Sequence, residues 1–512
     1  MSMVGEQRTP AEIRAGLDHP VIDGDGHWIE HIGVLREALG KIGGEAAATG
    51  AGYFHQGLIR SHSKTIEQRQ AEGLPQEGFW GLPTRNTRDR ASAMIPRFLY
   101  DRLDELGHDF AVMFPTMGLT YPSIDDEVMR VATCRAFNTY SAERFSDLGD
   151  RMTPAAIIPM HSPDEAIAEL DHAVGELGMK VVMLGSLARR HIPRIEQLAP
   201  ELADDFVAFD VLGIDSPYDY DPVWQKCLDL GISPTFHTGG RSQGLALRNS
   251  PSNFVFNHVG HFASAAEAVC KALFLGGVTR RFPKLRIGLL EGGVGWGIQL
   301  LGDLVEHWEV RNPAGLEETR PSALNPAAIA ELAHRYGDDE MARAFEAQAE
   351  RPVRSDVEMV GHLASLDDFA ACEVSSEAEL GELFIDNFYF GCEADDRMNA
   401  RAFQARHNPF GARFNAFYGS DIGHFDVADF TEVLPDAHGL VTDGLLGDDD
   451  FRDFVFTNPV RFWGASNPSF FEGTIIESQA AAVLANPLEG AASLWAEGHV
   501  GQSALRIADT EE

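Results

Sequence analysis

Four residues of types that bind metal ions stand at the ends of four apolar, strand-like segments of this sequence. They are His27, His237, Glu291 and Asp421. In a parallel α/β barrel, side chains at the carboxyl ends of the strands build the active site. One such residue would mean little, but four of them spread along the chain indicate a common site. The pattern predicts a divalent metal ion at the mouth of an α/β barrel.

The first of these segments ends in the alternating motif Asp23-Gly24-Asp25-Gly26-His27. Residues two apart in an extended chain face the same side, so Asp23, Asp25 and His27 are expected on one face. The glycines let the backbone approach a metal ion or a substrate closely. A carboxylate and an imidazole together suit Zn, Mn or Fe. Taken alone, the motif is more typical of an Asp/Gly turn after a strand.

The other candidate ligands have structural alternatives as well. His237 ends a short apolar run and could equally be a hydrogen-bonded core histidine. Glu291 follows two leucines, where a buried carboxylate must be paired, metal-bound or neutralised, or cap a helix. Asp421 ends the last strand-like run and could bind metal or act as a base toward a metal-bound water. The predicted metal ligands are Asp25, His27, His237, Glu291 and Asp421.

Several further side chains lie close to these ligands in the sequence. His424 could donate a proton to a leaving group, and Glu30 could reach the same metal ion or orient His27. His258 and His261 form an H-x-x-H pair that could chelate, cap a helix or line a pocket. The residues predicted to be catalytic are Asp421, His424 and His261. Those predicted to form an apolar substrate wall are Trp28, Phe236, Trp296 and Phe425.

Composition restricts the class of protein. Asp and Glu outnumber Lys and Arg by 78 to 41, and the net charge of −37 repels phosphate backbones and anionic lipid surfaces. The five cysteines are odd in number and widely separated, which favours reduced thiols. No signal-type segment and no apolar run of roughly 18 residues is present. We therefore expect a cytoplasmic protein with a small-molecule substrate and no nucleic-acid or membrane partner.

Eight strand-length apolar runs alternate with segments of helical period, as in βα units of a parallel sheet. The expected strands are 21–23, 110–115, 155–159, 181–185, 233–237, 285–291, 388–390 and 414–421, and helices are expected at 97–106, 163–177 and 264–275. This order predicts an α/β fold, a distorted (β/α)8 TIM barrel with helical insertions covering its C-terminal face.

The barrel is expected to span residues 20–435, with insertions at about 33–87 and 311–382 that cover its mouth. The first is expected to form a lid or a subunit contact, and the second to consist of inserted helices and a loop. Residues 436–512 are expected to form a C-terminal helical extension with a partly disordered tail. The sequence lacks a G-x-S-x-G elbow, an H-E-x-x-H motif and a G-x-G-x-x-G loop, which argues against serine hydrolases, zincins and dinucleotide binding.

The sequence resembles the amidohydrolase-related branch of the amidohydrolase superfamily. The resemblance covers about 20–186, 221–302 and 384–427, and its most specific stretches are Arg281–Arg286 leading into Leu290–Gly293, Leu103–Gly107 and Gly419–Asp421. In that family an H-x-H pair after strand one, histidines after strands five and six, and an aspartate after strand eight hold the metal. The matching positions here are Asp25 and His27, His237, Glu291, and Asp421.

Asp25 and Glu291 replace family imidazoles by carboxylates, which favours Mn or Fe over Zn. The departures also leave room for a second metal ion, held by Glu30, His258, His261 or His424. The resemblance implies a metal-dependent hydrolase or non-oxidative decarboxylase of a small organic acid, assembled as a homo-oligomer, a dimer. Two alternatives are a mono- or dinuclear non-haem iron oxygenase on the same scaffold and a catalytically silent partner subunit.

Overall fold

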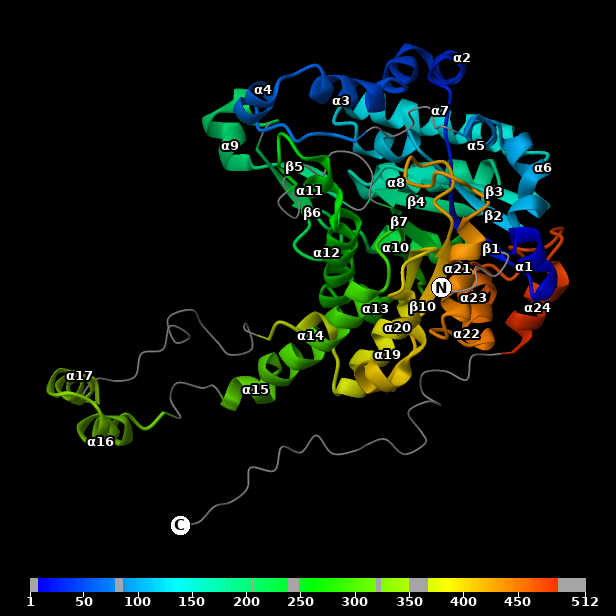
Figure 1. Ribbon diagram of the computed structural model, residues 1–512. Helices are drawn as coiled ribbons and strands as arrows, with labels where there is room; N and C mark the ends of the chain where they lie inside the picture. Colours follow the sequence, from blue (N-terminus) through cyan, green and yellow to red (C-terminus); the bar gives the residue numbers. More distant parts are fainter. Residues whose placement is uncertain are drawn as a thin grey trace, which may run out of the picture.

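A single sheet of eight strands forms the centre of the molecule (Figure 1). The computed structural model describes residues 8–78, 86–185, 187–204, 206–237, 248–318, 324–349 and 367–486. The strands are β1 (Ile22–Trp28), β2 (Phe110–Pro115), β3 (Met152–Ile158), β4 (Val181–Gly185), β7 (Pro234–His237), β8 (Ile287–Leu289), β9 (Phe388–Glu393) and β10 (Asn415–Gly419). Neighbours pair in this order and all pairs are parallel. The predicted (β/α)8 barrel is confirmed.

The first and last strands meet at their carboxyl ends. The His27 amide donates a hydrogen bond to the Ile422 carbonyl at 2.8 Å, and the Asp421 amide donates one to the Asp25 carbonyl at 2.9 Å. These two bonds join segments from opposite ends of the barrel sequence. They close the barrel at its mouth and bring the backbones of predicted ligands together.

Helices follow the strands around the outside of the barrel. The main ones are α6 (Pro96–Leu106), α7 (Glu127–Phe145), α8 (Pro163–Leu170), α10 (Asp221–Asp229), α12 (His261–Leu275), α14 (Gly295–Arg311) and α19 (Glu377–Asn387). Shorter ones are α1 (Pro10–Gly16), α9 (Pro193–Leu198), α11 (Phe254–His258), α13 (Val278–Arg281) and α20 (Asn399–Phe403). Because helices cover the outer face and side chains fill the inner one, strands such as β2 and β3 are buried along their whole length.

Local sequence explains where these helices begin and end. Ser162 caps α8 by accepting a hydrogen bond from the Glu165 amide, with a proline at the first helical position. The helix α6 starts at a proline and stops at Gly107, whose φ of 75° is a left-handed conformation that glycine adopts at low cost. Among the described helices, none combines the length and apolar character needed to cross a membrane.

The first insertion covers part of the barrel mouth. It consists of α2 (Ile32–Gly50), α3 (Tyr53–His62), α4 (Ile66–Ala71) and α5 (Thr87–Met94). The Tyr53 hydroxyl donates to the Ser123 carbonyl beyond β2, and Arg248, beyond β7, pairs with Glu77 at 2.8 Å. Both contacts join the insertion to segments that leave carboxyl ends of strands. Residues 79–85 of this insertion lie outside the described residues.

The second insertion carries a pair of helices that pack on each other. It contains α15 (Pro313–Glu318), α16 (Pro326–Tyr336) and α17 (Asp339–Ala349), while 319–323 and 350–366 lie outside the described residues. Figure 1 draws α16 and α17 packed on each other and apart from the barrel. Their buried apolar residues are the alanines Ala330, Ala333 and Ala342, which offer little surface for docking. Figure 1 does not show this helix pair over the barrel mouth, and the mouth cover expected of the second insertion stays a prediction.

One connection holds a small sheet that the sequence pattern did not indicate. Between β4 and β7, the strands β5 (Ala188–His191) and β6 (Val207–Asp210) pair antiparallel. Arg190 of β5 bonds Asp210 of β6 at 2.8 Å and joins the two strands through their side chains.

The C-terminal helices belong to the same core as the barrel. They are α21 (Val433–Thr442), α22 (Asp448–Arg452), the π-helical turn η10 (Asp453–Thr457), α23 (Asn458–Gly464) and α24 (Glu477–Ala485). Phe462 of α23 stacks on Phe417 at 5.6 Å, and its carbonyl accepts from the Ser233 hydroxyl. The helix α23 thereby packs against β10 and the segment that enters β7. The disorder predicted for the last ten residues of the tail falls outside the described residues.

Candidate metal centre

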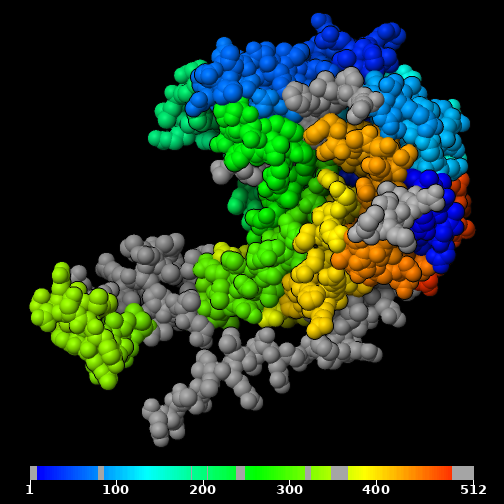
Figure 2. Space-filling model, in the orientation of Figure 1, coloured from blue at the N-terminus to red at the C-terminus, as the bar shows by residue number. Residues whose placement is uncertain are grey.

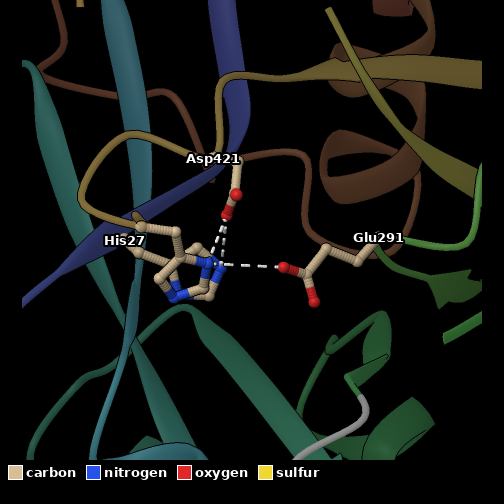
Figure 3. Close-up of side chains that lie close together, drawn as sticks. His27, Glu291 and Asp421 are labelled. Carbon is tan, nitrogen blue, oxygen red and sulfur yellow. Dashed lines mark ion pairs between the residues drawn. The ribbon is translucent and has the colours of Figure 1, made fainter. Parts of the chain in front are cut away.

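Six buried side chains from four strand ends converge at the barrel mouth. They are Asp25 and His27 from β1, His237 from β7, Glu291 after β8, and Asp421 and His424 after β10. Figure 3 shows the carboxylates of Glu291 and Asp421 pointing toward the imidazole rings of this group, one of which is His27. All five predicted ligands meet here, and His424 joins them.

The potential ligand atoms lie close enough to share one ion. His27 Nε2 is 3.5 Å from Asp25 Oδ1, 3.7 Å from Asp421 Oδ1 and 3.2 Å from His237 Nε2. Glu291 reaches His237 Nε2 at 3.3 Å with one oxygen. One group of ligand atoms within 4.8 Å comprises His27, Glu291, Asp421 and His424, and a second comprises Asp25, His27 and His237.

The chemistry of this donor set fits a divalent cation. Asp25 Oδ1 and Glu291 Oε2 are buried and accept no hydrogen bond from the described residues. Within that part of the chain, no lysine or arginine pairs with the carboxylates of Asp25, Glu291 or Asp421. A buried carboxylate needs a counter-charge or a proton. The His424 imidazole lies beside two of these carboxylates, at 2.6 Å from Asp421 and 3.5 Å from Glu291. A divalent ion would supply the remaining charge to all three.

Burial sets the protonation of these groups in the metal-free protein. It raises the pKa of Asp25 to about 6 and that of Glu291 to about 7, and it lowers the pKa of His27 well below its usual range. Burial opposes the charge of His424 too, but the adjacent Asp421 carboxylate, at 2.6 Å, raises the His424 pKa well above its usual range. Without a metal ion, the centre therefore holds protons that a cation would displace.

Two of the candidate ligands occupy strained backbone conformations. Glu291 has a φ of 59° and Asp421 a φ of 50°, both in the left-handed region that non-glycine residues seldom adopt. Each stands just beyond the end of its strand. Such conformations cost about 1–3 kcal/mol each and cluster at functional sites, where the surrounding structure enforces them.

A β-bulge changes the expected direction of one aspartate. The register between β1 and β2 shifts between Asp23 and Gly26, so strict alternation fails in the motif. Asp23 instead accepts hydrogen bonds from the Ser420 amide at 2.9 Å and the Ser420 hydroxyl at 2.5 Å. It anchors the segment that carries Asp421 and does not join the ligand group.

The contact between Gly419 and β1 gives a test of this packing. A Cβ at Gly419 would lie 2.6 Å from the Cβ of Asp25, so Gly419→Ala must displace that ligand. We expect the unfolding free energy to fall by about 1–3 kcal/mol. We expect the metal affinity to fall by about tenfold. Gly439→Ala is the matched control, since nothing lies near its Cβ position in α21. Metal titration and urea unfolding measure both effects, and equal affinities for the two variants would contradict the geometry.

Glu30 serves the backbone rather than the metal centre. Its carboxylate accepts from the amides of Met117 at 2.9 Å and Gly118 at 3.0 Å, and it lies outside both ligand groups. The ring of His27 is oriented instead by the Pro115 carbonyl, which accepts from Nδ1 at 3.3 Å. That bond leaves Nε2 as the nitrogen that faces the other ligands.

Burial raises the pKa of Glu30 to about 7, from an ordinary value of 4.5, which predicts a pH-dependent stability. The folded protein keeps this proton to higher pH than the unfolded chain does, so its contribution is complete below about pH 4.5 and is lost as pH rises to about 7. The loss is roughly 3 kcal/mol. Urea unfolding between about pH 5 and 8 should show a smaller loss of stability in Glu30→Gln than in the wild type, by roughly 3 kcal/mol. Part of the slope remains in the variant, because burial also raises the pKa of Asp25 to about 6 and that of Glu291 to about 7. The control Glu37→Gln, which changes an exposed carboxylate paired with Lys41, should follow the wild type. An unchanged slope in Glu30→Gln would disprove the assignment.

The two further histidines lie beside the centre and outside its ligand groups. His258 ends α11, and its ring lies 4.9 Å from Phe254. His261 begins α12, and burial lowers its pKa to about 3, so it holds no proton to donate near neutrality. Phe262 contacts both of these histidines, and its ring lies 6.2 Å from that of His237. The predicted catalytic or ligand roles of His258 and His261 are not supported by this placement.

Three of the four side chains predicted to form an apolar substrate wall pack against other aromatic residues. Trp28 packs on Phe137 and Phe145 in the outer layer, Phe236 packs on Trp224, and Trp296 packs on Phe390. Trp28 and Phe236 each neighbour a ligand in a strand, so their side chains point to the opposite face, toward the helices. Phe425, 39% exposed, does lie at the rim, close to Phe254 and His258.

An aromatic residue that the sequence analysis missed lies inside the barrel. The ring of Phe114 is 6.1 Å from that of His27 and 5.8 Å from that of His237. It is the last inward position of β2 before Pro115. The alternation along β2 was the signal available in the sequence, because it puts Phe114 on the same face as Val112.

A (β/α)8 barrel with buried carboxylates and imidazoles at its C-terminal mouth defines a metal-dependent TIM-barrel enzyme. A sequence profile of the amidohydrolase family matches residues 22–342, more than half of the chain. The chain belongs to this family. Membership confirms the predicted class, a metal-dependent enzyme of the hydrolase or decarboxylase kind, over the oxygenase and silent-subunit alternatives. Asp421 lies beyond the matched residues.

Solved structures that are similar to this chain include several decarboxylases. A dihydroxybenzoic acid decarboxylase from Polaromonas sp. JS666, with bound manganese and 2-nitroresorcinol, is 12% identical with a TM-score of 0.50, over 89% of this chain and 99% of that one. The 2,6-dihydroxybenzoate decarboxylase from Rhizobium is 14% identical with a TM-score of 0.48, over 87% and 98%. The 5-carboxyvanillate decarboxylase from Sphingomonas paucimobilis is 13% identical with a TM-score of 0.46, over 87% and 98%. At 12% identity, the likeness to the first of these structures concerns the fold alone.

Proposed function

We propose that this chain is a metal-dependent, non-oxidative decarboxylase of a small aromatic or unsaturated organic acid. One observation carries the proposal: Asp421 and His424, in contact at 2.6 Å, lie against the ligand atoms of a centre buried from solvent. Decarboxylation needs a proton donor at the reacting carbon and no water. A buried acid pair beside a metal centre supplies that donor and excludes competing water.

We infer that the ion is a single Mn²⁺. Three carboxylates make the donor set hard and anionic, which favours Mn or Fe over Zn. The two ligand groups share His27, whose Nδ1 is engaged by Pro115, so only Nε2 is available to an ion. One nitrogen binds one ion, which favours a mononuclear centre over the dinuclear alternative.

The protein side chains have separable tasks in this reaction. A bound divalent ion supplies Lewis-acid polarisation of the substrate's oxygen atoms. The carbon–carboxylate bond breaks, its electron pair stays on the substrate carbon, and carbon dioxide leaves. The Asp421–His424 pair then delivers a proton to that carbon. Phe114, beside the rings of His27 and His237, gives a planar substrate an apolar surface.

The proposed substrates are hydroxylated benzoates or acids of similar size. The dihydroxybenzoic acid decarboxylase named above acts on such an acid, and the family membership makes that chemistry the first to test. A carboxylate and a neighbouring hydroxyl can approach one ion together, which orients the ring.

Isotope labelling distinguishes decarboxylation from hydrolysis. Manganese-loaded protein is incubated with a panel of hydroxybenzoates and, separately, with small lactones and amides. In D₂O, decarboxylation releases carbon dioxide and puts one deuterium on the carbon that carried the carboxylate. In H₂¹⁸O, hydrolysis puts ¹⁸O into the product. Turnover confined to the lactones or amides, with ¹⁸O incorporated, would overturn the proposal.

Two expectations from the sequence stay predictions, namely the homodimer and the cytoplasmic location. Sedimentation velocity of the purified protein checks the first, with a species of twice the 56.0-kDa chain mass expected. Fractionation of the source cells checks the second.

A further inference from the structure

A second pocket lies where the first insertion meets the barrel. It is a cavity of about 140 Å³ enclosed by the segments that follow β1 and β2 and by the helices α3 and α5. Glu30 and Thr116 line it on the barrel side, and His55 and Arg90 line it on the insertion side. None of the six residues of the metal centre lines it. Figure 2 shows the insertion, in blue, lying over this side of the barrel.

Two polar atoms in this pocket have no partner among the described residues. Thr116 is 3% exposed, and its hydroxyl makes no hydrogen bond there. On the opposite wall, Nδ1 of His55 is also buried and makes no hydrogen bond with the described residues. Nearly all buried polar groups in proteins are hydrogen-bonded, so a buried hydroxyl facing a cavity indicates a place for a polar ligand.

The charges around the pocket favour an anion. Arg90 is the only lysine or arginine among the lining residues, and burial lowers its pKa, which indicates a partly desolvated guanidinium. Glu30 offers little negative charge below neutrality, because burial raises its pKa to about 7. A guanidinium, a hydroxyl and an imidazole together match the oxygens of a carboxylate.

The size and the remaining walls define the body of that ligand. Ile32, Phe54 and Met94 make the pocket apolar away from its polar groups. An apolar cavity of about 150 Å³ accommodates a benzene molecule. The space therefore suits one six-membered ring and is too small for a nucleotide.

We propose that this pocket binds a small monocarboxylate with a body of about one ring, through Arg90, Thr116 and His55, separately from the metal centre. Its walls come from both the insertion and the barrel, so the ligand would join the two. The proposal does not depend on which reaction the metal centre performs.

Calorimetric titration of chelator-treated, full-length protein with benzoate tests the proposal, with phenol and benzylamine as comparison probes. Without metal, the centre lacks the cation proposed to hold a substrate carboxylate, and the Arg90 and Thr116 variants then assign benzoate binding to the pocket. We expect saturable binding of benzoate, weaker binding of phenol and no binding of benzylamine. Arg90→Met should weaken benzoate binding by about tenfold or more, and Thr116→Val by about fivefold, since each removes a polar partner of the carboxylate. Arg97→Met, an exposed arginine on the next helix, is the matched control and should bind as the wild type does.

Three outcomes would overturn the proposal: no saturable binding of benzoate, equal binding by Thr116→Val and the wild type, or tighter binding of benzylamine. Circular dichroism confirms folding of each variant. If Arg90→Met does not fold, His55→Phe replaces it, with the same loss of affinity expected. Carbon dioxide release by the metal-loaded enzyme is measured separately, so failure of this proposal is distinguishable from failure of the proposed function.

Discussion

Asp421→Asn is expected to lower kcat for decarboxylation by roughly 10³-fold, the range associated with loss of a positioned proton donor. The asparagine amide cannot carry the transferable proton, and it leaves His424 without the carboxylate that raises its pKa. The effect should fall on kcat more than on KM, because the proton is transferred in the transition state. Carbon dioxide release is measured at saturating substrate, with manganese content determined on the same samples.

The metal content separates a proton-transfer defect from a ligand defect. We expect Asp421→Asn to retain manganese when the ion is supplied in excess, because Asp25, His27, His237 and Glu291 remain. Asp443→Asn, which changes an exposed aspartate paired with Arg397, is the control and should keep wild-type kcat. Activity close to that of the wild type in metal-loaded Asp421→Asn would remove Asp421 from the proposed proton path.

Glu291→Gln is expected to change stability in opposite directions with and without metal. In the metal-free protein, burial raises the pKa of Glu291 to about 7, so its charge is costly there. The variant should then unfold at the same temperature as the metal-free wild type or higher. In the presence of Mn²⁺ the wild type gains about 4 kcal/mol at roughly a thousandfold excess over Kd, whereas the variant, with a ligand lost and affinity down roughly 100-fold, gains far less.

Thermal unfolding at a series of manganese concentrations measures this change in the relative stability of the variant and the wild type. Glu176→Gln changes an exposed glutamate paired with His172 and should follow the wild-type curve at every concentration. Parallel curves for Glu291→Gln and the wild type would mean that Glu291 neither holds the ion nor repels its neighbours in the empty centre.

The positions of the candidate ligands could be predicted because the end of a strand can be recognised from the residues next to it in the sequence. Each of His27, His237 and Asp421 ends a short apolar run, and the carboxyl ends of parallel strands must meet at one edge of the barrel. Eight such runs in βα order predict a closed parallel barrel whose carboxyl ends form the mouth. The five candidate ligands do converge at that mouth.

The sequence analysis misplaced side chains whose direction depends on residues distant in the sequence. Alternation alone put Asp23 beside Asp25, but the bulge in β1, formed against β2, turned it toward Ser420. Closeness in sequence to a ligand suggested Trp28 as a substrate contact, although adjacent residues of a strand face opposite sides. Glu30 was similarly expected near the metal, and its partners are amides that follow β2.

The sequence by itself determined the barrel and the residue types at its mouth, because hydrophobic period and strand-end position are local properties of the chain. Only the tertiary structure decided that His424 contacts Asp421 and Glu291, that Phe114 faces the histidines, and that the first insertion encloses a pocket with Thr116. These contacts depend on the barrel closing through hydrogen bonds between β1 and the segment after β10, and on an insertion folding back over β2. No local pattern encodes such pairings, since their energy comes from burial and hydrogen bonding between distant segments.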